Sequence, residues 1–202
     1  MFNIDQIQQR LEQHKPSFNA AGPNTREAAV AIVLCPQADQ CDVLFIKRAT
    51  REGDPWSGHM AFPGGHREPD DPGLMGAAMR ETSEEIGLLL EHSDHLGPLD
   101  HQIAQPRGRT LDMLIAPHVF RIDEKPKLTP NYEVADTVWA PLHTLAANSL
   151  HTTETFPMAG RPTVFNGYRL AEGHFVWGLT YRILKSFFAA LDPNWRPPQE
   201  ID

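Results

Sequence analysis

Three glutamates, Glu81, Glu84 and Glu85, stand close together in the segment GGHREPDDPGLMGAAMRETSEEIGL, residues 64–88. On an α-helix these positions are i, i+3 and i+4, so the three carboxylates share one stripe of its surface. Carboxylates this close repel one another, and only Arg80 stands beside them to compensate. Clustered oxygen ligands of this kind suit hard divalent cations, Mg²⁺ or Mn²⁺. A solvated helix face is the alternative, because runs of charge are usually solvated.

The segment that carries these glutamates is predicted to form a helix over residues 72–86. Asp71 and Pro72 suit an N-cap followed by proline at the first helical position, and Gly87 suits the residue after the helix end. An apolar face is predicted because suitable residues recur every three or four positions. They are Met75, Ala78, Met79, Thr82 and Ile86. The carboxylates are expected on the opposite face.

Two glycines, Gly64 and Gly65, stand shortly before this helix. Glycine permits unusual dihedrals and a close approach of the backbone to a ligand. We therefore expect these residues beside the metal and the substrate, with a backbone carbonyl completing the metal shell.

The spacing of the whole segment resembles the Nudix box, Gx5Ex7REUxEExGU, in which U is apolar. The matching residues are Gly65, Arg80, Glu81, Glu84, Glu85 and Gly87. Asp71 stands where the pattern has its first glutamate, the stretch from there to Arg80 is one residue longer, and Thr82 fills an apolar position. The resemblance implies an α/β Nudix fold, a mixed β-sheet sandwiched between α-helices. It also implies metal-dependent hydrolysis of a nucleoside diphosphate derivative.

The resemblance also implies roles for the box residues. Glu81 and Glu85 are the principal metal ligands, Glu84 is a further ligand with a catalytic role, and the Gly64 carbonyl joins them. Arg80 orients a glutamate by ion pairing, for which a guanidinium fork suits better than lysine. A metal-bound water attacks one phosphorus of the diphosphate.

Outside the box, Glu133 lies in PNYEVADTVW and is predicted to assist catalysis from a loop, as a metal ligand or as the base. An exposed loop glutamate is the alternative. Arg48 and Arg51 are candidates for binding substrate phosphates, as are Arg107 and Arg109. For each of these arginines a structural or solvated role also stays open.

A second signature, LLTxR[SA]x3Rx3Gx3FPGG, is similar to the chain upstream of the box and belongs to the coenzyme A diphosphatase branch. The matching residues are Leu44, Arg48, Ala49, Gly58 and the run Phe62, Pro63, Gly64 and Gly65. The loop before Gly58 is one residue longer here, and Arg51 is the arginine nearest to the signature position. The branch implies cleavage of coenzyme A or its thioesters into adenosine 3′,5′-bisphosphate and 4′-phosphopantetheine.

Other functions stay open beside this one. The alternative substrates are ADP-ribose, NADH and dinucleotide-type diphosphates. A different class is a Nudix module that binds a nucleotide without cleaving it, although such modules usually lose box glutamates that this chain keeps.

The composition limits the partners. The chain has 202 residues, of which 41% are hydrophobic and 22% charged, as in globular proteins. With 18 Lys and Arg against 26 Asp and Glu, the formal charge is −8, so neither nucleic acid nor a membrane is expected as a partner. The expected partner is a small nucleotide-type molecule. A monomer and a homodimer both stay open.

The organisation expected is a helical extension over 1–24, a Nudix domain over 25–191 and a loosely held proline-rich tail over 192–202. The N-terminus lacks the features of a signal peptide, so a cytoplasmic protein is expected. Cys35 and Cys41 are then expected as reduced thiols, with a bridge between them as the alternative.

The remaining patterns predict the elements that would position the site. A helix is expected over 3–14, strands over 28–35 and 42–49, a long loop over 50–73, a strand over 136–142, a helical turn over 142–148 and a helix over 179–191. Pro117 makes the strand 110–122 an edge or bulged strand. Asn166 and Gly167 are expected at the tip of a hairpin over 162–178.

Overall fold

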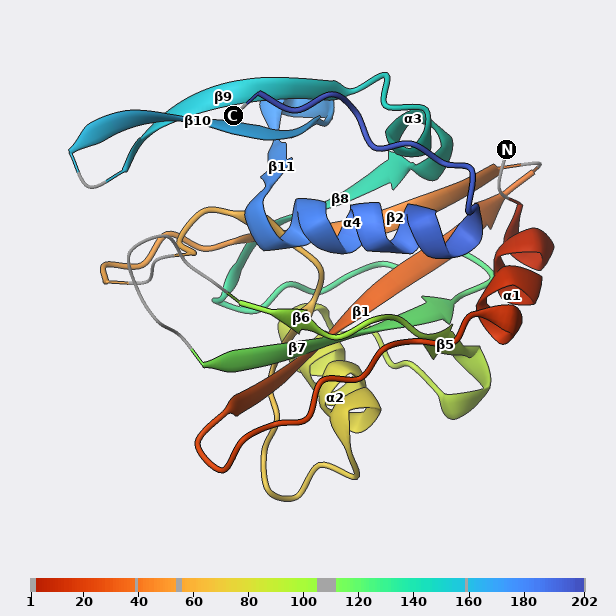
Figure 1. The fold of residues 1–202 in the computed structure, drawn as a ribbon. Helices are drawn as coiled ribbons and strands as arrows, with labels where there is room; N and C mark the ends of the chain where they lie inside the picture. The colour runs from red at the N-terminus through yellow and green to blue at the C-terminus, as the bar shows by residue number, and fades with distance from the viewer. Residues whose placement is uncertain (1–2, 39, 54–55, 105–111, 159, 202) are drawn as a thin grey trace.

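The computed structural model describes residues 3–38, 40–53, 56–104, 112–158 and 160–201. Within these residues the chain forms an eight-stranded mixed sheet and a separate three-stranded sheet, with helices packed around them (Figure 1). In chain order the elements are α1 (Ile4–Gln13), β1 (Arg26–Gln37), β2 (Gln40–Arg48), β3 (Met60–Ala61), β4 (Gly64–His66), α2 (Leu74–Ile86), η1 (His92–Asp94), β5 (His95–Pro98), β6 (Gln102–Ile103), β7 (Met113–Arg121), β8 (Val134–Pro141), α3 (Leu142–Ala146), β9 (His151–Met158), β10 (Arg161–Arg169), η2 (Ala171–Gly173), β11 (Phe175–Trp177) and α4 (Gly178–Leu191).

Strand β1 organises the large sheet. It pairs antiparallel with β2 and β4, and parallel with β7 along the opposite edge. The strands predicted over 28–35 and 42–49 are confirmed as the β1–β2 hairpin, in which Leu34 lies opposite Val43. Strand β8 continues the sheet beyond β2.

Two apolar cores cover the two faces of this sheet. Side chains alternate along β1, so Ala31 and Val33 pack toward α2, whereas Ile32 and Leu34 pack in the core that includes residues of α1 and α4. Figure 1 shows α2 and α4 on opposite sides of the sheet. The predicted fold, a mixed sheet between helices, is therefore confirmed.

The N-terminal helix predicted over 3–14 is confirmed as α1. Asn3 and Gln6 form a capping box, in which the Gln6 N–H donates to the Asn3 side chain at 2.9 Å. Ile7 is fully buried against the main core, so this helix is packed onto the domain rather than projecting from it.

Of the two alternatives for the strand with Pro117, an edge strand was wrong, because β7 is flanked on both sides. It pairs with β1 on one side and with β5 and β6 on the other. An irregularity does occur in its pairing with β5, where the register shifts between His95 and Gly97. Pro117 lies between the residues that pair with β6 and those that pair with β5, and its carbonyl accepts the Leu99 N–H at 3.0 Å. A residue without an N–H is tolerated at such a break in the ladder.

The prediction for Asn166 and Gly167 was also wrong. Both residues lie within β10, and the turn to β11 is made by η2. Gly167 is required for a different reason: a Cβ there would lie 2.3 Å from the carbonyl oxygen of Val176 on β11. The Asn166 side chain bonds the backbone of Ile201 in both directions.

The C-terminal tail is held by specific contacts, contrary to the loose tail expected. Trp195 packs on Phe188 and donates its indole N–H to the Ala146 carbonyl at 2.8 Å. Glu200 accepts a hydrogen bond from the Tyr181 hydroxyl and pairs with Lys185.

Three further findings complete the fold. The loop expected over 50–73 contains the short strands β3 and β4. Cys35 and Cys41 are both buried free thiols, so the expectation of reduced cysteines is confirmed and they form no bridge. Among the described residues, no helix is long and apolar enough to cross a membrane.

Candidate active site

The helix that carries the glutamates, α2, begins at Leu74 rather than at residue 72. Its N-cap is Gly73, which provides no side-chain cap, so the predicted capping role of Asp71 was wrong. The helix ends as predicted, at Gly87 in the left-handed conformation. Thr82, at the apolar box position, is fully buried and donates its hydroxyl proton to the Ala78 carbonyl at 2.7 Å, which satisfies this group locally.

Asp71 forms an ion pair with Arg80 instead of capping the helix. The Arg80 Nε and Nη2 atoms lie 2.9 Å and 3.0 Å from the two oxygens of Asp71, a bidentate arrangement. The side chain of Asp71 is only 5% exposed. Hydrogen bonds from Arg80 hold the pKa of Asp71 below its usual value. Aspartate at the first box position therefore anchors the box arginine.

Arg80 links this anchor to the glutamates. Its Nη1 atom lies 3.2 Å from Glu81 and 3.1 Å from Glu84, and its Nη2 atom donates to the His66 carbonyl at 2.9 Å. One guanidinium thus ties α2 to β4 and to the loop before the helix. The expectation that Arg80 ion-pairs with a glutamate agrees with this geometry.

Glu85 is buried on the sheet side of α2, with 2% of its surface exposed. It therefore does not lie opposite the apolar face, as the helical pattern predicted. Its Oε2 atom accepts the Gly64 N–H at 2.9 Å. Burial raises the pKa of Glu85 to about 7, against the lowering effect of that hydrogen bond. The negative charge of Glu81 raises it further.

Glu81 lies directly against the glycine pair. A Cβ on Gly65 would lie 2.5 Å from the Glu81 carboxylate, and one on Gly64 would lie 2.2 Å from the Ala29 carbonyl oxygen. Both glycines are thus needed for β4 to pass between β1 and α2. Partial burial raises the pKa of Glu81, although Arg80 opposes the shift.

Glu84 differs from its two neighbours. Its side chain is 56% exposed and pairs with Arg80. The carboxylate oxygens of the three glutamates do not gather within 4.8 Å of one another, whereas another set of side chains among the described residues does. Glu84 as a metal ligand stays a prediction.

The groups around Glu81 and Glu85 fit a divalent cation. Two partly or fully buried carboxylates on α2 face the backbone of β4, and burial shifts the pKa of both upward. The nearby guanidinium of Arg80 is already engaged by Asp71. A cation bound by carboxylate oxygens would offset the remaining negative charge.

Glu133 lies in the same electrostatic neighbourhood. Its charge raises the pKa of both Glu81 and Glu85, whereas Arg48 lowers that of Glu85. Glu133 accepts a hydrogen bond from Arg51 at 3.0 Å, and its carbonyl accepts the N–H of Ala49 at 2.7 Å. The structure thus brings together three predicted site residues, Glu133, Arg48 and Arg51, with Arg51 engaged by Glu133.

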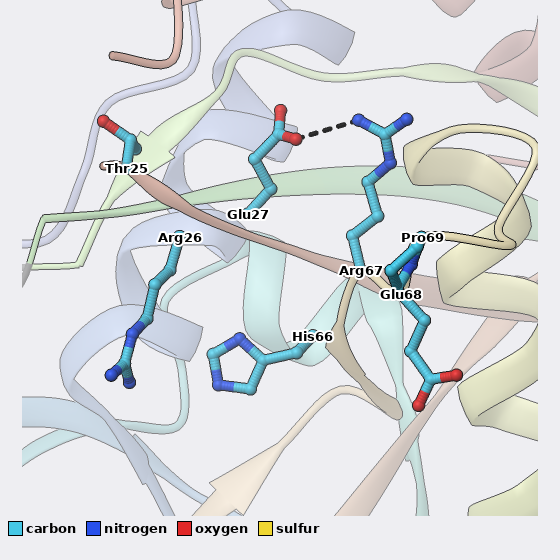
Figure 2. Close-up of a pocket in the computed structure, with 7 residues that line it drawn as sticks. All are labelled: Thr25, Arg26, Glu27, His66, Arg67, Glu68 and Pro69. Atoms are coloured by element: carbon cyan, nitrogen blue, oxygen red, sulfur yellow. Dashed lines mark hydrogen bonds and ion pairs between the residues drawn. The ribbon is translucent and has the colours of Figure 1, made fainter. Parts of the chain in front are cut away.

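A pocket of about 550 Å³ adjoins β4 at the start of β1 (Figure 2). Three basic residues line it: Arg26, His66 and Arg67. Arg67 pairs with Glu27 at 2.8 Å, whereas Arg26 has no ion-pair partner among the described residues. The sequence analysis did not single out these three basic residues. Two of them, His66 and Arg67, directly follow the glycine pair in GGHR, and that position could have identified them.

The other candidates are less informative. Arg107 and Arg109 lie outside the described residues. Trp177 stacks on Phe156 and lies tilted against His59, at centroid distances of 5.1 Å and 4.5 Å, and so has a packing role.

The NUDIX domain family matches residues 25–158, the part of the chain that contains both the sheet and the site. The chain belongs to the NUDIX family, as the box indicated.

Known proteins similar to the chain add detail to this assignment. The uncharacterized protein C14C4.10c of Schizosaccharomyces pombe is 34% identical over 154 residues, which are 66% of this chain and 46% of that protein. The chain therefore spans about half the length of that relative. The human mitochondrial coenzyme A diphosphatase NUDT8 is 31% identical over 173 residues, 85% of this chain and 72% of that protein.

The fold has a counterpart among solved structures. A MutT/nudix family protein from Enterococcus faecalis has a TM-score of 0.55 at 18% identity, over 92% of this chain and 68% of that chain. This likeness supports the fold alone.

Proposed function

We propose that this protein is a metal-dependent pyrophosphohydrolase that cleaves the diphosphate bond of a nucleoside diphosphate derivative, with coenzyme A or its thioesters as the substrate. The observation that carries the hydrolytic function is the pair Glu81 and Glu85. These carboxylates lie beside Gly64 and Gly65, where burial removes water from around them and raises the pKa of both. Buried carboxylates whose pKa is shifted in this way are typical of functional sites.

In this proposal, Glu81 and Glu85 would hold Mg²⁺ or Mn²⁺, with Glu84 and the Gly64 carbonyl as further ligands. The bound ion would supply a more acidic water and charge neutralisation for the diphosphate. Arg80 keeps the α2 carboxylates oriented through its bidentate pair with Asp71. Glu133 accepts a proton from the attacking water or serves as a further ligand. Its pair with Arg51 holds its carboxylate in one orientation.

The pocket beside β4 supports a site for one end of the substrate. It is an open hollow of about 550 Å³ on the surface, which would accommodate one end of a nucleotide-type substrate. Its wall is connected to the box, since the His66 carbonyl accepts from Arg80 and the Glu68 N–H donates to Asp71. The guanidinium of Arg26 would bind a substrate phosphate there, while Arg48 lies closer to the carboxylates.

Coenzyme A is favoured by two observations. The chain carries the run Phe62–Gly65 with Arg48 and Gly58, which match the branch signature, although Ile46 replaces its threonine and no arginine occupies its second arginine position. The human relative at 31% identity is a coenzyme A diphosphatase. A cytoplasmic location remains part of the proposal.

The test compares coenzyme A, ADP-ribose, NADH and diadenosine polyphosphates with Mg²⁺ or Mn²⁺, each with and without EDTA. We expect EDTA-sensitive release of adenosine 3′,5′-bisphosphate and 4′-phosphopantetheine from coenzyme A. If another substrate is cleaved much faster, the coenzyme A assignment fails while the hydrolytic function stands. If no substrate is cleaved and one of them binds, the chain is a nucleotide-binding module.

A further inference from the structure

A second cluster of metal-ligating side chains lies on elements that carry none of the α2 ligands. Asp136 belongs to β8, Glu172 to the one-turn helix η2, and His174 directly follows that turn. One ligand atom from each residue lies within 4.8 Å of the other two. Within the part of the chain that the structure describes, no other three acidic, histidine or cysteine side chains meet so closely.

The imidazole of His174 supplies the strongest indication of a ligand. Its side chain is only 9% exposed, and its Nε2 atom is shielded from solvent without a hydrogen-bond partner. This atom lies 3.3 Å from Asp136 Oδ2, but the contact does not have the geometry of a hydrogen bond. A shielded polar atom left without a partner is unfavourable, so an additional binding partner for Nε2 would stabilise the arrangement.

Apart from the imidazole of His174, the two carboxylates have no cationic partner among the described residues. Neither Asp136 nor Glu172 forms an ion pair with a lysine or arginine in that part of the chain. Asp136 Oδ1 accepts the Thr137 N–H at 2.8 Å, which leaves Oδ2 toward His174. Two neighbouring carboxylates repel each other unless a positive charge lies between them. A cation would satisfy both carboxylates and the imidazole together.

The spacing and the donor types indicate which cation. Bonds of about 2.0–2.1 Å at tetrahedral angles separate two ligand atoms by roughly 3.3 Å. The distance between His174 Nε2 and Asp136 Oδ2 is 3.3 Å. In such an arrangement the nitrogen lone pair is directed at the ion rather than at the neighbouring oxygen. Imidazole nitrogen with carboxylate oxygen is a donor set typical of Zn²⁺ and other divalent transition metals.

We propose that Asp136, Glu172 and His174 bind a divalent transition-metal ion, for which Zn²⁺ is the probe. The site joins two structural units, since β8 belongs to the large sheet and the turn before β11 belongs to the small one. The ion would fix that turn against β8. This proposal is independent of the hydrolytic function, because it uses none of the box residues.

The experiment measures Zn²⁺ binding to the full chain. The protein is stripped with EDTA, dialysed, and titrated with Zn²⁺ by calorimetry, with excess Mg²⁺ present as a competitor for the α2 carboxylates. We expect one Zn²⁺ per chain for the wild type and a rise in its melting temperature. For His174→Gln we expect affinity weaker by on the order of 100-fold or more, since even changes beyond the ligands cost 10–100-fold.

Two further variants make the result decisive. Glu172 is exposed, so Glu172→Gln leaves the fold intact and is expected to weaken binding even if His174→Gln does not fold. His92 is exposed on η1, and His92→Gln controls for the loss of a histidine elsewhere. The proposal is overturned if the wild type binds no Zn²⁺ under these conditions, or if Glu172→Gln and His174→Gln bind it as tightly as His92→Gln does. The contact would then be a simple ion pair.

Discussion

Glu85 gives the sharpest prediction for the metal-free protein, because its ionisation opposes folding. Its pKa is raised by burial from 4.5 to about 7. Each pKa unit corresponds to about 1.4 kcal/mol, so the charged form destabilises the folded chain by roughly 3 kcal/mol. Gln has the same shape, carries no charge, and still offers an oxygen to the Gly64 N–H. We therefore expect Glu85→Gln to stabilise the metal-free protein.

The sign of the pH dependence follows from the direction of this shift. Since the folded state holds the Glu85 proton more tightly than the unfolded state, stability falls as the pH rises from about 4.5 to about 7. Below that window Glu85 is protonated in both states and contributes nothing. Above it the full penalty is present. The stabilising effect of Glu85→Gln is therefore expected to approach roughly 3 kcal/mol near pH 8 and to vanish near pH 4.

The assay is urea unfolding followed by far-UV circular dichroism in EDTA at several pH values. Glu84→Gln is the matched control, because its carboxylate is on the same helix but 56% exposed and paired with Arg80. We expect this control to show no comparable gain at any pH. Equal stability of wild type and Glu85→Gln near pH 8 would refute the argument from burial.

Three further predictions concern the residues around the site and the small sheet. Asp71→Asn should lower the unfolding free energy by about 1–3 kcal/mol in urea titrations, because Arg80 loses a charged partner. The stability difference between wild type and Asp71→Asn should shrink as the pH falls below the ordinary aspartate pKa of 3.8, since the pKa of Asp71 is lowered in the folded protein. Equal stability at neutral pH would contradict the role of Asp71 in holding Arg80. Gly167→Ala should destabilise by about 1–3 kcal/mol, because its Cβ would lie 2.3 Å from the Val176 carbonyl oxygen; an unchanged melting temperature would contradict this. Arg26→Gln should raise the KM for coenzyme A with little change in kcat, and an unaltered KM would show that Arg26 does not bind the substrate.

The sequence was most informative where one local pattern determines the geometry. The β1–β2 hairpin follows from two apolar runs joined by a short polar turn. The convergence of Arg80, Glu81 and Glu85 follows from helical spacing together with the Nudix box. Neither pattern reveals that Glu85 turns toward the sheet, because that depends on the close approach of β4, which the glycine pair permits.

The errors share a physical cause, which is that local signals compete with tertiary partners. Asp71 suits a helix cap, but a bidentate bond to Arg80 is available nine residues later and satisfies both oxygens. Asn166 and Gly167 suit a turn, but here one anchors the C-terminal tail and the other admits β11. Such long-range contacts are not encoded in the local pattern that suggested each element.

The central claim is that Glu81 and Glu85 hold the metal on which hydrolysis depends. The most direct measurement is the turnover of Glu81→Gln and Glu85→Gln with Mg²⁺ or Mn²⁺, on whichever panel substrate the wild type cleaves fastest. Circular dichroism confirms that each variant is folded. The account predicts a loss of several orders of magnitude in kcat with the fold intact, since removing a carboxylate ligand does not empty a core. Near-wild-type turnover by folded Glu85→Gln would contradict it.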